Sequence, residues 1–108
     1  MVTHKQIYEA LGSIKTDYSV QVEKAGQDIQ KQRLRTLADI CDIFAEDLEK
    51  RKPVIDSLKI PIHLTLKDLV DKVGGSKESV RNYINGIAVK TRSLLGTTTK
   101  LKYELLEY

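Results

Sequence analysis

The sequence has a single cysteine, Cys41, among its 108 residues, so no disulfide can form within the chain. A lone cysteine on an apolar helical stripe suits a reducing, intracellular setting. No apolar run approaches the roughly 20 residues that a membrane-spanning helix requires, and the N-terminal residues lack the apolar core of a signal peptide. We therefore expect a cytoplasmic protein.

Histidine is also scarce, and this scarcity removes most interpretations as an enzyme or a metal protein. His4 and His63 lie far apart in the chain, and no cysteine or histidine cluster has metal-ligand spacing. The sequence contains no glycine-rich phosphate loop ending in lysine and no nucleophile elbow. We expect a protein that is not an enzyme and that has no metal or other cofactor.

Aromatic residues make up only 6% of the chain, and its five tyrosines are scattered. Scattered rings argue against a stacking platform for single-stranded nucleic acid. The balance of 41% hydrophobic and 31% charged residues is that of a folded domain. A chain of this length buries roughly 65% of its unfolded surface, which is enough for a core without disulfides.

Acidic residues are almost absent from one segment, and the whole net charge of +3 arises in the C-terminal half. Residues 1–53 contain nine basic and nine acidic residues, whereas residues 54–108 contain nine and six. Between Ser76 and Lys102 only Glu78 opposes six basic residues, namely Lys77, Arg81, Lys90, Arg92, Lys100 and Lys102. This imbalance favours a surface that faces a polyanion, although a solvated basic face is the alternative.

Apolar residues at alternating steps of three and four predict helical structure through residues 3–50. The first stripe consists of Ile7, Leu11, Ile14, Tyr18, Val22, Ala25 and Ile29, and the second of Leu34, Leu37, Cys41, Phe44 and Leu48. The two stripes are about 120° out of phase. Because no proline or turn dipeptide separates them, we expect one long or kinked helix rather than a turn near Lys31. Pro53 should end it.

A strand and two short helices are predicted next. Ile60, Ile62 and Leu64 alternate with other residues, and Pro61 restricts such a strand to a sheet edge. Thr65 is the expected N-cap of the first helix, with Asp68 in a weaker relative of the Thr-x-x-Glu capping box, and Gly74 ends the helix. Ser76 caps the second, which has an apolar face of Val80, Tyr83, Ile84 and Ile87.

The sequence does not decide where the second helix ends. Asn85-Gly86 is a possible stop, but Ile87, Thr91, Leu94 and Leu95 could extend the stripe. Leu101, Tyr103 and Leu105 predict a final strand, for which 60–64 could supply the partner and 93–95 the near side of a short wing.

The segment Thr65–Gly86 resembles the helix-turn-helix of many bacterial and archaeal repressors, with Gly74 in the turn and Val80, Tyr83 and Ile84 at the packing positions. Residues 33–108 as a whole resemble the winged helix-turn-helix superfamily. The resemblance implies a mainly α fold with a small β component, a winged helix-turn-helix preceded by a long N-terminal helix. Two positions depart from the pattern: Val70 replaces a small residue, and Gly75 replaces an apolar one.

A second motif helix lying in the major groove would read bases with its exposed side. We expect base contacts from Lys77, Glu78, Arg81, Asn82 and Asn85. Phosphate contacts are expected from Thr65, Ser76, Ser79, Lys90, Arg92, Lys100 and Lys102.

Residues 1–32 are interpreted as a helical extension that serves dimerisation or partner docking. Its dimerisation residues would be Ile7, Leu11, Ile14, Tyr18, Val22 and Ile29. The predicted function is double-stranded DNA binding by a small homodimeric, nucleoid-associated transcriptional regulator. The alternative is an accessory subunit of a replication or transcription assembly, in which the winged helix and the long helix contact protein.

Overall fold

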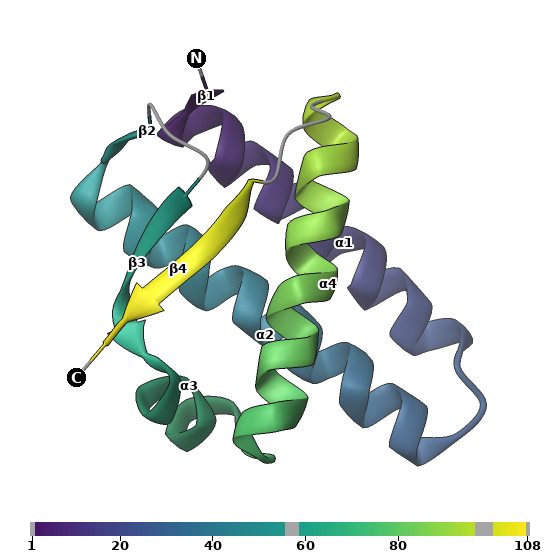
Figure 1. The fold of residues 1–108 in the computed structure, drawn as a ribbon. Coiled ribbons are helices and arrows are strands. Elements are labelled where there is room, and N and C mark those ends of the chain that lie inside the picture. The colour runs from purple at the N-terminus through teal and green to yellow at the C-terminus, as the bar shows by residue number, and fades with distance from the viewer. Residues whose placement is uncertain (1, 56–58, 97–100, 108) are drawn as a thin grey trace.

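The computed structural model describes residues 2–55, 59–96 and 101–107, which form four helices and four short strands (Figure 1). The helices are α1 (His4–Lys24), α2 (Asp28–Arg51), α3 (Leu66–Val73) and α4 (Lys77–Leu95). The strands are β1 (Val2–Thr3), β2 (Val54–Ile55), β3 (Lys59–Thr65) and β4 (Lys102–Leu106). The prediction of a mainly α protein with a small β component is confirmed.

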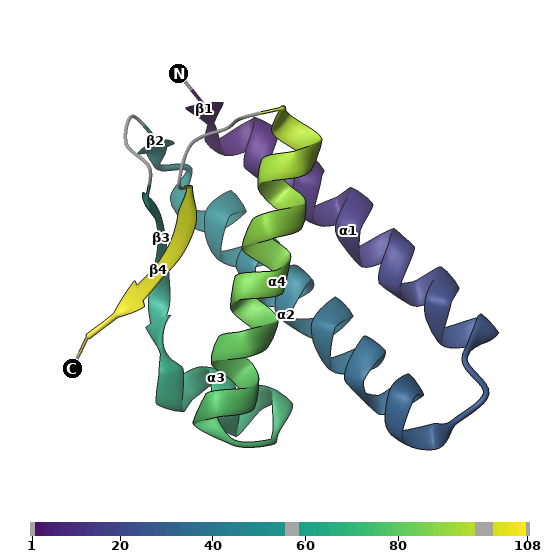
Figure 2. The same cartoon turned by 45° about the vertical axis from the view of Figure 1, so that its right-hand side comes forward.

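The N-terminal half is a hairpin of two helices that run side by side in opposite directions (Figures 1 and 2). The chain leaves the helical conformation at Ala25 and re-enters it after Gln27, so the prediction of one long helix is wrong. Gly26 lies in this turn and lowers helix propensity there. Reversing the chain also lets two out-of-phase apolar stripes face a common core, which a straight helix cannot do.

The first apolar stripe is part of the hydrophobic core of the single chain. Ile7, Leu11, Ile14 and Tyr18, which were expected to form a dimer interface, are buried with the apolar residues of α2 and α4. Val22 is half-buried against the same core, whereas Ile29 is exposed at the start of α2. These buried residues cannot meet a second copy while the fold is intact. The stripe belongs to the core because it covers the apolar side of α2, so residues 1–32 are no separate extension.

The starts of α3 and α4 and the turn between them lie where their capping residues predict, whereas α4 continues past Gly86 to Leu95. Thr65 caps α3 and Ser76 caps α4. Between them Gly74 and Gly75 have φ values of +82° and +88°, a conformation that glycine adopts at little cost. Two successive residues of this kind explain why the turn tolerates Gly75 in place of the usual apolar residue. Gly96, with φ of +66°, ends α4.

The predicted wing hairpin is not found where the sequence placed it. Residues 93–95 are the last turn of α4, and β4 instead pairs in parallel with β3, with Ile60 opposite Tyr103. The expected strand pairing of 60–64 with the C-terminal segment is thereby confirmed. The helix continues past Gly86 because Ile87, Ala88 and Thr91 extend its buried face.

The inner face of the β3–β4 sheet closes the core against α2 and α4. The rings of Tyr103 and Phe44 lie 5.0 Å apart between centroids, and the Tyr103 hydroxyl is 2.8 Å from the Thr91 hydroxyl on α4. Cys41 is buried beside them, and burial raises the pKa of its thiol to about 12. The thiol is therefore protonated and packs as a small apolar group.

Candidate nucleic-acid interface

Two capping motifs fix the start of each helix in the helix-turn-helix. The Thr65 hydroxyl accepts from the Asp68 amide at 3.1 Å, and the Asp68 carboxylate accepts from the Thr65 amide at 3.1 Å. These bonds lower the pKa of Asp68. At α4 the Ser76 hydroxyl accepts from the Ser79 amide at 3.1 Å and lies 2.9 Å from the Ser79 hydroxyl. The hydroxyls predicted to contact phosphate are thus engaged in caps, each with further hydrogen-bonding capacity.

The five residues predicted to contact bases all lie on the exposed side of α4. They are Lys77, Glu78, Arg81, Asn82 and Asn85. In the part of the chain that the structure describes, none of their side chains forms a hydrogen bond or an ion pair. The opposite side of the helix, with Val80, Ile84 and Ile87, is buried. The helix therefore presents two cations, two amides and one carboxylate to solvent from a rigid support.

Two basic residues in the second half of α4 are directed toward other parts of the chain. The Lys90 ammonium lies 4.2 Å from the centroid of the Tyr18 ring on α1. The Arg92 guanidinium donates from Nε to the Leu101 carbonyl before β4. Both side chains are half-buried. Their predicted phosphate contacts are corrected accordingly: both residues anchor α4 to its neighbours, because the extended helix places them beside α1 and β4 rather than on a wing.

The two remaining phosphate predictions have different outcomes. Lys100 lies outside the described residues. Lys102 is exposed on β4 and forms no ion pair among residues 2–55, 59–96 and 101–107.

Two further cations, Lys67 and Lys72, lie on α3 and were not among the predicted contacts. Both are exposed and have no ion-pair partner within the described residues. Both occupy polar positions of the first motif helix, but they precede the strongly basic segment between Ser76 and Lys102. Lys72 lines a hollow together with Asp47 and His63, so it lies toward the end of α2. Within the described residues, Lys67, Lys77, Arg81 and Lys102 are thus four cations without an ion-pair partner on or beside α3 and α4.

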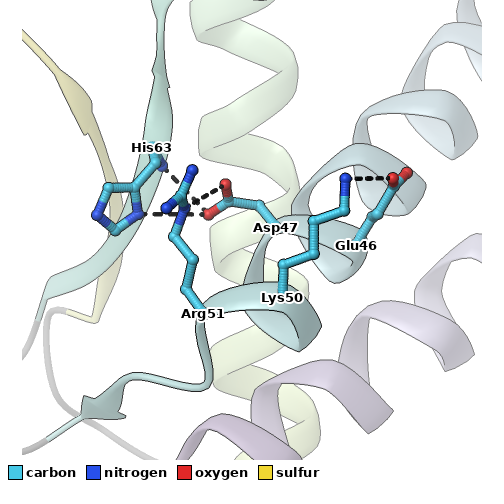
Figure 3. A network of polar contacts seen from close by, with 5 residues as sticks. All are labelled: Glu46, Asp47, Lys50, Arg51 and His63. Carbon is cyan, nitrogen blue, oxygen red and sulfur yellow. Dashed lines mark hydrogen bonds and ion pairs between the residues drawn. The ribbon is translucent and has the colours of Figure 1, made fainter.

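A polar cluster at the end of α2 is a competing candidate site (Figure 3). The carboxylate of Asp47, which is 10% exposed, accepts from the His63 amide at 3.2 Å and from Arg51 Nε at 3.3 Å. The His63 ring nitrogen Nδ1 is 3.7 Å from the same carboxylate. Nearby, Lys50 pairs with Glu46 at 3.0 Å. The contacts tie β3 to α2, and the described residues include no group of three or more potential metal ligands.

Comparisons with protein families, curated proteins and solved structures give no match to this chain. Within the described residues, no helix combines the length and the apolar character that crossing a membrane requires. The interpretation of the site therefore depends on its geometry and chemistry.

Proposed function

We propose that this protein binds double-stranded DNA, with α4 in the major groove and α3 beside it over the sugar-phosphate backbone. The observation that carries the proposal is the row of exposed, unpartnered side chains on the first half of α4. In this row Arg81 has the chemistry to pair with guanine O6 and N7, and Asn82 or Asn85 with adenine N6 and N7. Glu78 would accept from cytosine N4.

The unpaired cations around this row supply the phosphate contacts in the proposal. Lys67 lies on α3, Lys77 lies at the N-terminus of α4, and Lys102 lies on the neighbouring strand. Lys72 is left out because it lies beside Asp47 and His63. Lys90 and Arg92 are left out because their side chains contact Tyr18 and Leu101. About three phosphate contacts would give log affinity a slope near −3 against log salt.

The biological setting that we propose is transcriptional regulation. A symmetric complex would require another surface than the first apolar stripe, because Ile7, Leu11 and Ile14 are fully buried within one chain. Sedimentation of the free chain and of its duplex complex would give the number of copies bound.

The test is a duplex-binding titration of Arg81→Ala/Asn82→Ala against the unsubstituted chain, after selection of bound duplexes from a random pool. Losing one good base contact costs about 1–3 kcal/mol, so we expect affinity for the selected duplex to fall at least tenfold. Arg33→Ala is the matched control, since Arg33 is equally exposed but lies on α2. Absence of duplex binding at low salt, or equal affinities for all three proteins, would contradict the proposal.

An accessory, protein-contacting role is the second candidate function. Val89 and Leu94 favour it, because these apolar side chains are 58% and 54% exposed on α4. Apolar side chains of this size at a solvent-facing helix surface suit a protein partner better than a phosphate backbone. A folded chain that fails to bind any duplex would favour this role.

A further inference from the structure

A groove lies beside β4, on the side of the strand that faces α4. One wall is α4, with Arg81, Ile84 and Asn85, and the other is β4 with Glu107 after it. Lys59 of β3 and Leu66 of α3 also line the groove. Figure 1 shows β4 lying between β3 and α4, and the groove has a volume of about 500 Å³. It lies where the near strand of the predicted wing would have paired with β4.

The main chain of β4 is unpaired along this groove. In the described part of the chain, β4 has a backbone partner only in β3. The Leu101 carbonyl, just before β4, points away from β3 and accepts a hydrogen bond from Arg92 of α4. Because successive residues of a strand direct their N–H and C=O groups to alternate edges, Tyr103 and Leu105 present theirs to the groove as well.

We propose that this groove binds an extended peptide of a protein partner, which adds to β4 as a third strand. Strand addition would pair the free N–H and C=O groups on the open edge of β4. Alternate apolar residues of the peptide would pack against the side chains of Leu66 and Ile84. The occupant is one extended strand, because a groove of about 500 Å³ holds a few side chains and not a folded domain.

Charge defines the chemistry of this peptide as acidic. Arg81 and Lys102 line the groove and have no ion-pair partner within residues 2–55, 59–96 and 101–107. Of the two acidic residues beside them, Glu104 pairs with Lys59 at 3.2 Å. Glu107 remains at the far end of the groove. A peptide that alternates acidic and apolar residues would thus match both the cations and the apolar floor.

The same groove offers a means of regulation that rests on the proposed DNA binding. Arg81 and Asn85 line the groove and also belong to the proposed base-contacting row. A bound acidic peptide would occupy these two side chains and displace the duplex. The peptide would then act as a protein-borne competitor of DNA.

The experiment selects binders to the full chain from a random decapeptide library and then measures backbone amide exchange by NMR with one enriched peptide. We expect enrichment of alternating acidic and apolar residues, and at least tenfold slower exchange of the Tyr103 and Leu105 amides when peptide is bound. Exchange of the Glu104 amide, which faces β3, should change less. No enriched peptide, enrichment without acidic residues, or unchanged exchange at both amides would overturn the proposal.

A pair of tryptophan variants locates the peptide. Asn85→Trp places a large ring in the groove and should weaken peptide binding at least tenfold, whereas Asn82→Trp, outside the groove on the same helix, should leave it unchanged. Equal affinities for the two variants would contradict the location. The exchange measurement contains no DNA, so a failure of duplex binding leaves this test decisive, and added duplex separately reports the competition.

Discussion

The helical hairpin α1–α2 and the helix-turn-helix α3–α4 are both amphipathic, but their exposed sides differ in how their charges are used. Five of the six ion pairs among the described residues include a residue of α2, such as Lys15 with Asp42 at 2.7 Å. None includes a residue of α3 or α4. Ion pairs are therefore concentrated on the hairpin, whereas no charged side chain in the first half of α4 has an ion-pair partner in the described part of the chain.

This difference matters more for function than for stability. Exposed ion pairs contribute about 0–1 kcal/mol each, so the pairs on the hairpin stabilise the fold little. They do, however, place cations and anions side by side, and residues 1–53 are neutral in total, with nine basic and nine acidic residues. In the first half of α4 the cations Lys77 and Arg81 have no ion-pair partner within the described residues, and a polyanion would supply one. Charge balance and local pairing together separate the hairpin surface from the candidate interface.

The prediction with the largest expected effect asks whether the α1–α2 hairpin and the α3–α4 segment fold separately. Phe44 is fully buried on α2 and contacts Tyr103 of the C-terminal strand. We expect Phe44→Ala to lower the free energy of unfolding by about 3–5 kcal/mol and to speed amide exchange in α4 as much as in α1. Urea unfolding and NMR exchange would measure both effects.

Ile29→Ala is the control, because Ile29 is 70% exposed and should change stability by less than about 0.5 kcal/mol. Loss of protection confined to α1 and α2 would show instead that the hairpin folds independently of α3 and α4.

Local signals in the sequence predicted the helix-turn-helix well. The roles of Thr65, Ser76 and Gly74 are decided by short-range chemistry, a cap or a positive φ, which can be identified without knowing the rest of the fold. The exposed row on α4 followed from helical periodicity alone. These features need no knowledge of which elements are neighbours.

Features set by long-range packing were not predictable in the same way. The stripe of α1 was correct in composition, yet no local signal tells whether it covers α2 or a second copy. Lys90 and Arg92 appeared free because their partners, Tyr18 and Leu101, belong to other elements. The prediction of a wing was wrong for a related reason. The Thr91 hydroxyl forms a hydrogen bond with the hydroxyl of Tyr103, a residue of another element, and this contact helps α4 to continue.

The second prediction concerns stability at alkaline pH, where two buried groups of the hairpin should lower the free energy of unfolding. Burial raises the pKa of Cys41 from 9.0 to about 12 and that of Tyr18 from 10.0 to about 12. The unfolded chain therefore loses these protons at lower pH than the folded chain. Stability is fully present below pH 9 and falls between about pH 9 and 12, by up to about 1.4 kcal/mol per pH unit for each group.

Urea midpoints measured from pH 8 to 11 would show this decline, and Cys41→Ala provides the control. The variant lacks the thiol, so its decline should begin about one pH unit higher, where Tyr18 ionises in the unfolded chain. An identical onset for both proteins would mean that the thiol is not protected by burial.

The smallest test compares the two capping boxes. Thr3 and Thr65 make the same reciprocal bonds, Thr3 with Gln6 and Thr65 with Asp68. Removing either hydroxyl by substitution with alanine costs about 1 kcal/mol. The helices differ in length, however, with 21 residues in α1 and 8 in α3, and only Leu69 of α3 is buried. A short helix with so little burial depends more on its cap.

Thr65→Ala should therefore increase exchange of the amides throughout α3, while Thr3→Ala should affect only the first turn of α1. If DNA binding requires α3 in place beside α4, Thr65→Ala should also weaken duplex affinity a fewfold and Thr3→Ala should not. Similar local effects of the two substitutions would show that α3 is held by the turn at Gly74 and Gly75 rather than by its cap. In that case the geometry of the interface would depend on the turn, whose positive φ values are the remaining local constraint on how α3 meets α4.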